Sequence, residues 1–325
     1  MASRIFLFFD SMVDLAVVLQ HAKEAAHVAG PIIRKAWAAG SRSSIEATKM
    51  NAVDLVTETD QQCEAAILAV LKANYPDAEY IGEETVGSGK YQLSDKPTWI
   101  IDPIDGTTNF VHRIPLCAVL VSYADKGQVL VGVIYDPIGN ETFYASKGGG
   151  AFMDSASCGG DRIAIRTSGA SELAQAVINF EVGYRRGPEY ADWLGNRFGC
   201  MVVNKVRGVR SIGAAGPALA YVACGRLDAT FEQGSWDMNC GPKIWDFSGA
   251  SLVVEEAGGA CIDAKTGGSF DVMGRSFFAA SSKVLADSLW TALNAANPPE
   301  LIELGGPDGS ASKPKDVKVA KSPAK

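Results

Sequence analysis

Residues 100–108 read Ile-Ile-Asp-Pro-Ile-Asp-Gly-Thr-Thr, and this stretch is the most informative about the fold. The bulky apolar residues predict a short buried strand that ends at the first aspartate. Pro103 and Gly106 predict a tight turn, so the carboxylates of Asp102 and Asp105 can converge instead of pointing to opposite faces. Convergent carboxylates repel each other unless a cation or a shared proton lies between them.

Oxygen ligands dominate this stretch, since neither histidine nor cysteine lies beside the two aspartates. Hard oxygen ligands favour Mg²⁺ over zinc. The backbone N–H groups of Gly106, Thr107 and Thr108 are predicted to open a short helix and to form an anion site. A metal site beside an anion site indicates phosphoryl chemistry. The simpler alternative is an Asx-turn that only caps the strand.

Composition limits the classes of partner. The chain has 325 residues, of which 47% are hydrophobic and 21% charged, so it can bury a large core and is not wholly disordered. Its net charge of −7 argues against nucleic acid as a partner. A phosphorylated substrate must therefore be recruited by local positive charge, which a bound metal supplies.

Cysteine usage and hydropathy predict the compartment. The seven cysteines form no Cys-x-x-Cys pair, which disfavours a zinc site or a disulfide framework and favours buried free thiols in a reducing compartment. The apolar start at residues 5–9 is too short for a signal peptide core, and no apolar run reaches the length of a membrane span. We expect a soluble cytoplasmic protein without a membrane partner.

Apolar periodicity predicts the elements of the first half. A helix is predicted over residues 11–40, kinked or split at Gly30-Pro31, followed by a loop over 41–51 and by a second helix from Asp60 to about 74–76. Strands are predicted over residues 99–101, 117–124, 129–135, 141–146, 151–153 and 163–166.

The second half alternates strands with helices. Strands are predicted over 177–180, 201–207 and 227–232, and helices over 188–199, 214–224, 246–257 and 282–296. We therefore divide the chain into an α+β half with the metal motifs, an α/β half with the substrate-side residues and the last metal ligand, and a Lys-rich disordered tail, at residues 1–168, 169–304 and 305–325. The two halves are expected to share a cleft.

Several motifs in the same order resemble the inositol monophosphatase family. The segment WIIDPIDGTTNFVHRIP at residues 99–115 is similar to the first signature of that family, and WDFSGA at residues 245–250 is similar to the second. Further similar segments are GEET, DLVTETD and GVRSIG at residues 82–85, 54–60 and 208–213. The resemblance spans most of residues 11–300. It implies a layered α-β-α-β-α sandwich of the inositol monophosphatase and fructose-1,6-bisphosphatase type, and a homodimer.

The resemblance also implies a phosphatase that uses two to three Mg²⁺ ions. One ion would be held by Glu83, Asp102 and the carbonyl of Ile104, a second by Asp102, Asp105 and Asp246, and a weaker third by Glu83 and waters. The first ion would acidify a water, and the second would stabilise the leaving alkoxide.

Further roles follow from the same resemblance. Glu83 and Thr107 would orient the water, while Asp60 accepts the Thr107 hydroxyl. The residues expected to bind substrate are Asp105, Gly106, Thr107, Thr108, Ser211 and Glu232. Lys49 corresponds to a mobile lysine of the family near the third metal. The alternative interpretation, nearly as well supported, is a solvated loop lysine.

Three positions leave alternatives. Glu83 and Glu84 would point to opposite sides of a strand, so one is a ligand and the other a supporting or surface group. His112 is expected to pack or hydrogen-bond beneath the loop instead of acting as a base. Trp-Asp occurs twice, and Asp246 is preferred to Asp237 because an apolar helical pattern follows only Asp246.

Substrate choice is the least determined feature. Glu232 resembles the glutamate that contacts inositol hydroxyls, but it precedes Asp246 by fourteen residues, several more than in animal members of the family. The insertion at residues 235–242 is expected to border the pocket, with a dimer contact or a plain surface loop as alternatives. We expect Mg²⁺-dependent hydrolysis of myo-inositol 1-phosphate, with uncompetitive inhibition by Li⁺.

Two other functions are considered. One is a phosphatase of the same superfamily with another small substrate, such as a sugar phosphate, a nucleotide 3′-phosphate or a compound related to the quinate pathway in fungi. The other is a catalytically silent regulatory binding protein, which does not need the complete set of Glu83, Asp102, Asp105, Thr107 and Asp246.

Overall fold

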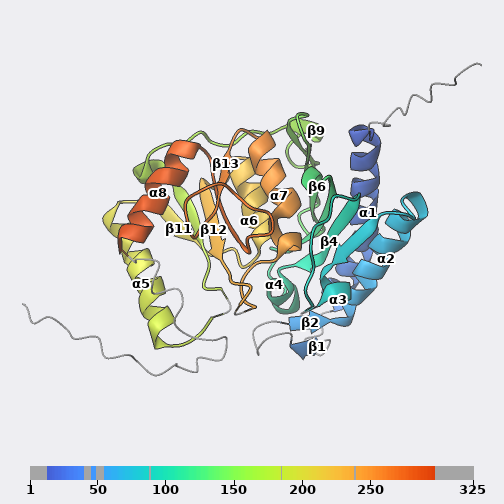
Figure 1. Ribbon diagram of the computed structural model, residues 1–325, viewed down its shortest axis with the longest axis horizontal. Helices are drawn as coiled ribbons and strands as arrows, with labels where there is room; N and C mark the ends of the chain where they lie inside the picture. Colours follow the sequence, from blue (N-terminus) through green and yellow to red (C-terminus); the bar gives the residue numbers. More distant parts are fainter. Residues whose placement is uncertain are drawn as a thin grey trace, which may run out of the picture.

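The computed structural model describes residues 13–39, 45–48, 55–87, 89–183, 185–237 and 239–296. Two large sheets and three layers of helices alternate as α-β-α-β-α across the molecule (Figure 1). The middle helices pack on both sheets, because α7 contacts strands of each. The layered sandwich expected from the family resemblance is therefore present.

The helices of the described residues form three layers, with three short helices outside them. The layer at the right of Figure 1 is α1 and α2, the middle layer is α6 and α7, and the layer at the left is α5 and α8. Their bounds, with those of the short helices α3, α4 and η2, are Leu15–Ala39 (α1), Glu58–Asn74 (α2), Glu83–Val86 (α3), Thr107–His112 (α4), Leu173–Gln175 (η2), Pro188–Val203 (α5), Ala215–Ala223 (α6), Ile244–Glu256 (α7) and Lys283–Ala296 (α8).

The larger sheet has seven strands in the order β3-β4-β5-β6-β7-β8-β9, and only the β3–β4 pair is parallel. Its strands are Glu79–Gly82 (β3), Thr98–Asp105 (β4), Ala118–Asp125 (β5), Gln128–Asp136 (β6), Glu141–Ser146 (β7), Ala151–Ser155 (β8) and Gly160–Ala164 (β9). All eight residues of β4 are buried, which explains the continuous apolar run before its aspartates. The hairpin predicted from residues 117–135 is confirmed as β5–β6.

The second sheet has five strands in the order β11-β10-β12-β14-β13. Its strands are Val177–Phe180 (β10), Gly208–Arg210 (β11), Ala229–Gln233 (β12), Ala260–Ile262 (β13) and Ser276–Ala280 (β14). β10 pairs in parallel with β11 and β12, whereas β14 pairs antiparallel with β12 and β13. The sequence analysis did not predict β13 and β14. The antiparallel pairs that β14 makes with β12 and β13 give a mixed sheet.

Three expectations about local structure were wrong, and a fourth was wrong in part. Of the kink or split expected at Gly30-Pro31, the split is absent, because the apolar face of α1 continues across the proline through Ala29 and Ile33, both fully buried. The segment 41–51 contains a strand, Ile45–Thr48 (β1), which pairs with Leu55–Thr57 (β2).

The other two errors are strand boundaries. No strand occupies residues 201–207, since α5 runs to Val203 and β11 begins at Gly208. The apolar β-branched pair Val202 and Val203 suggested a strand, but both side chains are exposed at the end of α5. The strand expected at 163–166 lies earlier, at β9.

Other predictions meet the limits of the described residues. The chain start, Lys49 and the tail at 305–325 lie outside them. Within them, no helix is long and apolar enough to cross a membrane. All seven cysteines are free, but only Cys63, Cys117 and Cys240 are buried, and Cys158 is exposed. The expectation of buried thiols therefore holds only in part.

The middle layer sits against the large sheet by direct backbone contact. A methyl group added to Gly132 of β6 would lie 2.2 Å from the carbonyl oxygen of Gly249 in α7, and one added to Gly249 would lie 2.7 Å from the Cβ of Ser122. Backbone cannot move aside as a flexible side chain can. Glycine at both positions therefore fixes the distance between α7 and the sheet.

We predict that Gly132→Ala lowers the free energy of unfolding by about 3 kcal/mol, because the added methyl group overpacks this contact. Gly195→Ala on α5 is the control, since its Cβ would meet nothing within 4 Å. It should raise the free energy of unfolding by about 0.5–1 kcal/mol through helix propensity. Denaturant unfolding measures both, and a Gly132→Ala protein as stable as the wild type would contradict the close contact.

Candidate active site

The two central aspartates lie at the end of β4, not after it. The pairing of β4 with β5 shifts between Asp102 and Asp105, and this irregularity lets both carboxylates converge although they lie on one strand. Gly106 follows with φ of 86°, and a Cβ there would lie 2.9 Å from both the Ala214 Cβ and the Leu116 carbonyl oxygen. Only glycine fits this turn, from which α4 begins at Thr107.

The third aspartate comes from the start of α7. Asp246 lies in the first turn of that helix, and its Oδ2 accepts the backbone N–H of Lys243 at 2.5 Å. One carboxylate oxygen each from Asp102, Asp105 and Asp246 lie within 4.8 Å of one another. Asp237, the alternative to Asp246, is exposed and lies outside this cluster.

The cluster concentrates negative charge in a buried place. Burial, and then the charge of Asp246, hold the pKa of Asp105 well above its usual range. Burial and the charge of Glu83 raise the pKa of Asp246 to about 6. Two backbone N–H groups at the start of α6, from Ala215 at 3.3 Å and Gly216 at 2.5 Å, donate to Asp105 and offset part of this cost.

Glu83 opens the short helix α3 directly after β3. The argument that Glu83 and Glu84 point oppositely on a strand was therefore wrong, although Glu83 is close enough to raise the pKa values of both Asp105 and Asp246. A residue that the sequence did not reveal holds this helix. Buried Glu64 of α2 accepts the backbone N–H groups of Glu84 and Thr85, each at 2.8 Å, and the Thr85 hydroxyl.

Asp60 and Thr107 meet as expected. The Thr107 hydroxyl lies 3.4 Å from Asp60 Oδ1 and 3.2 Å from the carbonyl oxygen of Ile104, so it can donate to either. Asp60 is 1% exposed. Glu64 follows Asp60 by one helical turn, and this i, i+4 spacing on α2 was the signal that could have identified it.

A pocket of about 190 Å³ opens beside the carboxylates. On the β4 side it is lined by Asp105, Gly106, Thr108 and Asn109. A second wall comes from the region of the five-stranded sheet, the start of α6 and α7, and consists of Glu181, Val182, Gly183, Gly213, Ala214, Ala215, Glu232, Pro242 and Asp246. The predicted cleft between the two layered parts is therefore present.

Buried Asn109, which the sequence did not single out, ties these walls together. Its Nδ2 donates to the carbonyl oxygen of Leu116, which follows α4, at 2.7 Å and to that of Ile212, which precedes α6, at 2.8 Å. A methyl group on Gly213 would lie 3.0 Å from the Asn109 amide. The α4 turn therefore also fixes the loop that precedes α6.

The substrate-side predictions have mixed placements. Glu232 lines the pocket, and burial, followed by the charge of Asp246, raises its pKa to about 8. Ser211 is exposed and is not on the pocket wall. Its hydroxyl donates to Glu181 Oε2 at 2.8 Å, while Glu181 also accepts the N–H groups of Ile212 at 2.8 Å and Gly213 at 2.7 Å. Glu181, which the sequence did not reveal, is therefore the pocket residue here.

His112 and Lys49 do not extend the site. His112 is exposed and does not line the pocket, so the expectation that it packs beneath the loop was wrong. Lys49 lies outside the described residues. The insertion does border the pocket as expected, through Pro242.

The donor set fits a hard divalent cation. The cluster offers three carboxylates and no histidine or cysteine, which is the ligand chemistry of Mg²⁺ and its relatives, not of zinc. Burial raises the pKa values of Asp105 and Asp246, and the charges of neighbouring carboxylates raise them further. A bound cation would remove the repulsion and keep all three carboxylates ionised.

The chain is similar to known proteins over most of its length. The sequence profile of the inositol monophosphatase family matches residues 14–297. Human inositol monophosphatase 1 is 39% identical over 242 residues, which cover 74% of this chain and 82% of the human protein. Inositol monophosphatase 2 of Solanum lycopersicum is 40% identical over 287 residues, with coverages of 88% and 98%.

Solved structures show the same fold. The extragenic suppressor protein suhB of Bartonella henselae superposes with a TM-score of 0.72 at 28% identity, covering 85% of this chain and 98% of its own. Inositol monophosphatase from Anabaena superposes with a TM-score of 0.69 at 28% identity, with coverages of 87% and 98%.

We predict that Mg²⁺ stabilises the protein through the three aspartates. At a concentration 100 times its dissociation constant the ion should add about 2.7 kcal/mol to the free energy of unfolding. Asp102→Asn should lose most of this gain. Without metal, the variant should be no less stable than the wild type, because a repelling charge is removed and the amide oxygen can still accept the Ile104 N–H, now 3.0 Å from Asp102 Oδ1.

Thermal unfolding with Mg²⁺ and with EDTA measures both effects. Asp237→Asn serves as the control, since it removes an exposed aspartate outside the cluster and should keep the full gain. An equal Mg²⁺ gain in Asp102→Asn and in the wild type would rule out the cluster as the cation site.

Proposed function

The chain belongs to the inositol monophosphatase family of phosphoric monoester hydrolases, and we propose that it releases phosphate from myo-inositol 1-phosphate with the help of Mg²⁺. One observation carries this proposal. Asp102, Asp105 and Asp246 converge from two separate elements within 4.8 Å of one another, and two of them line the pocket. A buried triad of carboxylates that also faces a pocket suits an anionic substrate only when cations accompany it.

The residues that would hold the cations are Glu83, Asp102, Asp105, Asp246 and the carbonyl of Ile104. Bound Mg²⁺ supplies acidified water and neutralises charge on the phosphate. Gly106 and Thr108 line the pocket beside Asp105, where the backbone at the start of α4 can receive phosphate oxygens. The phosphate is thereby placed between the carboxylate cluster and the α4 turn.

Thr107 and Glu83 orient the attacking water in this proposal. The Thr107 hydroxyl donates its proton towards Asp60 or the Ile104 carbonyl, which leaves its oxygen lone pairs available to accept a hydrogen bond from water. Glu83 is kept near the cluster by the anchoring of α3 on Glu64. Positioning of this kind accounts for much of phosphoryl-transfer catalysis.

The alcohol part of the substrate would face the second wall. Glu181 and Glu232 line the pocket there, and their carboxyl oxygens can accept hydrogen bonds from the hydroxyl groups of a polyol. The pocket thus separates a phosphate end near Asp105 from a hydroxyl-binding end near Glu232. This arrangement of a phosphate end and a hydroxyl-binding end supports a small phosphorylated polyol as the substrate class.

A second candidate is another small phosphomonoester of the same superfamily. The observation that favours it is Pro242, because this residue of the unusually long segment between Glu232 and Asp246 lies on the pocket wall. A silent binding protein is less well supported, since Thr107, Asp60 and Glu64 form a support for catalysis that binding alone does not require. A homodimer is a further inference from the family resemblance, and a cytoplasmic location is one from the cysteine and hydropathy patterns. Light scattering and cell fractionation test them.

We predict that the purified protein releases phosphate from myo-inositol 1-phosphate in Mg²⁺, and that EDTA abolishes the release. Li⁺ should inhibit uncompetitively. A panel with a sugar phosphate and a nucleotide 3′-phosphate, assayed by phosphate release, compares the candidates. If another panel member has the highest kcat/KM, that compound replaces myo-inositol 1-phosphate as the proposed substrate. If no member is turned over, the binding protein is favoured.

We predict that Glu83→Gln lowers kcat by at least about 100-fold, because several kcal/mol of transition-state stabilisation depend on its charge. Its neighbour provides a matched control. Glu84→Gln makes the same chemical change one residue away and should keep kcat within about threefold, since Glu83, not Glu84, is the glutamate whose charge acts on Asp105 and Asp246. Steady-state kinetics at saturating Mg²⁺ measures both, and equal losses in the two variants would remove Glu83 from the mechanism.

A further inference from the structure

A narrow hairpin, residues 234–242, separates Glu232 from Asp246 and is described except for Met238. Ser235 and Cys240 exchange backbone hydrogen bonds of 2.8 and 3.1 Å across it. At its base a methyl group on Gly241, whose φ is 77°, would lie 2.3 Å from the Gly234 Cα. The two backbone segments therefore touch, and glycine is required at both positions. This segment, which we call the pocket hairpin, is an ordered element and not a plain surface loop.

Arg275 lies under the pocket hairpin and is 1% exposed. Its Nε donates to the carbonyl oxygen of Pro242 at 2.6 Å, and its Nη2 donates to those of Cys240 at 3.0 Å and Gly241 at 2.9 Å. Its own backbone closes the base, where the Gly234 N–H donates to the Arg275 carbonyl oxygen at 2.8 Å. One side chain thus gathers three consecutive carbonyl groups.

Two costs show that this arrangement is specific. Burying a guanidinium ion is unfavourable unless its donors are satisfied, and here oxygens of the pocket hairpin satisfy them. Arg275 also has φ of 55°, in the left-handed region that non-glycine residues rarely adopt. Both costs are offset only while the hairpin carbonyls face the side chain. The hairpin and Arg275 therefore order each other.

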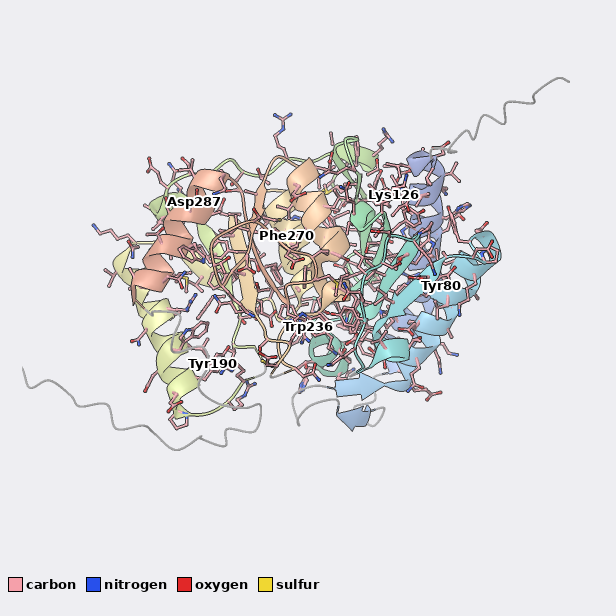
Figure 2. The ribbon with its side chains drawn as sticks, viewed as in Figure 1. Tyr80, Lys126, Tyr190, Trp236, Phe270 and Asp287 are labelled. Atoms are coloured by element: carbon pink, nitrogen blue, oxygen red, sulfur yellow. The ribbon has the colours of Figure 1, made fainter. Side chains whose placement is uncertain are left out.

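The outer side of the pocket hairpin is fastened by aromatic contacts. The Trp236 indole N–H donates to the Met273 carbonyl oxygen at 2.8 Å, and the Arg275 guanidinium lies 4.9 Å from the Trp236 ring centre. The Trp236 and Tyr91 rings are 5.1 Å apart, and the Tyr91 hydroxyl accepts the Ile244 N–H at 3.0 Å. Figure 2 shows Trp236 towards the lower edge of the view, the side on which α4 lies.

The pocket hairpin is continuous with the wall that faces the substrate alcohol. Pro242, whose carbonyl Arg275 holds, lines the pocket together with Glu232 and Asp246. Gly241 and Glu232 also line a narrow crevice next to it. The positive charge of Arg275 opposes the rise in the pKa of Glu232. Arg275 thus acts on both the shape and the charge of this wall without lining the pocket itself.

We propose that Arg275 is a positioning residue for substrate choice, which holds the pocket hairpin so that Pro242 and Glu232 together select the polyol. This inference rests on the proposed phosphatase function and extends it to the specificity of the same site. The Arg275 side chain donates to carbonyl groups of the pocket hairpin and not to the carboxylates or the α4 turn, which act on the phosphate. Loss of the guanidinium should therefore weaken recognition of the alcohol while the hydrolytic step is retained.

The test compares two substrates that share the phosphate but not the polyol, myo-inositol 1-phosphate and p-nitrophenyl phosphate. Arg275→Met should raise KM for the inositol ester about tenfold, with kcat and the KM for the aryl ester within about twofold, because uniform binding of the alcohol is lost. The KM of Arg275→Lys for the inositol ester should lie between those of Arg275→Met and the wild type. Hydrogen exchange at the Ser235 and Cys240 amides should accelerate in Arg275→Met.

Arg197→Met is the matched control. Arg197 is also 1% exposed, with its guanidinium 4.1 Å from the Trp193 ring centre and 3.3 Å from Asn294 Oδ1, and it does not line the pocket. Its loss should lower stability without changing the ratio of the two KM values. Trp236→Ala, at a side chain 38% exposed, provides a milder second variant should Arg275→Met fail to fold, and it should shift the ratio in the same direction.

The outcomes separate this inference from the proposed function. Wild-type turnover of neither substrate would contradict the phosphatase itself. If the wild type turns over both substrates, two results would overturn the role of Arg275 alone. One is an equal fall in kcat/KM for both substrates in Arg275→Lys and Trp236→Ala. The other is unchanged kcat/KM for both substrates in these variants.

Discussion

Mutual repulsion among three buried carboxylates is the constraint around which this molecule is arranged. Asp102 and Asp105 are brought together by an irregular strand pairing, and Asp246 is added by the start of α7. Like charges in a buried place cost several kcal/mol unless positive charge accompanies them. The close approach of Gly132 and Gly249 lets α7, which carries Asp246, pack directly on the large sheet.

The two walls of the pocket divide the chemistry between them. The wall formed by β4 and α4 carries the groups that act on the phosphate, and their supports are buried carboxylates of α2 that hold Thr107 and α3. The other wall carries Glu181, Glu232 and Pro242, which face the alcohol. One hydrolytic step can thus be combined with different alcohols, because Arg275 shapes the second wall through hairpin carbonyl groups and not through the carboxylates.

Local patterns in the sequence predicted the turn with Asp102 and Asp105 and most individual helices and strands, whereas the layered sandwich and the roles of Glu83 and Thr107 came from the family resemblance. The β5–β6 hairpin and the choice of Asp246 over Asp237 depended on nearby residues alone, and their placement agrees. Glu181 and Arg275 could not be predicted, because each acts through backbone groups distant in sequence. Glu64 acts in the same way, and only its i, i+4 spacing from Asp60 could have pointed to it. The strand wrongly predicted at 201–207 has a different cause. The sequence pattern implied that Val202 and Val203 are buried in a strand, but both are exposed at the end of a helix.

The central claim is that the aspartate cluster holds divalent cations for the reaction. Anomalous diffraction from crystals grown with Mn²⁺, a hard cation suited to the same oxygen ligands, tests it most directly. The account predicts a strong anomalous peak about 2–2.5 Å from carboxylate oxygens of Asp102, Asp105 and Asp246. Well-ordered crystals that show no peak there at saturating Mn²⁺, or a peak only elsewhere, would contradict it.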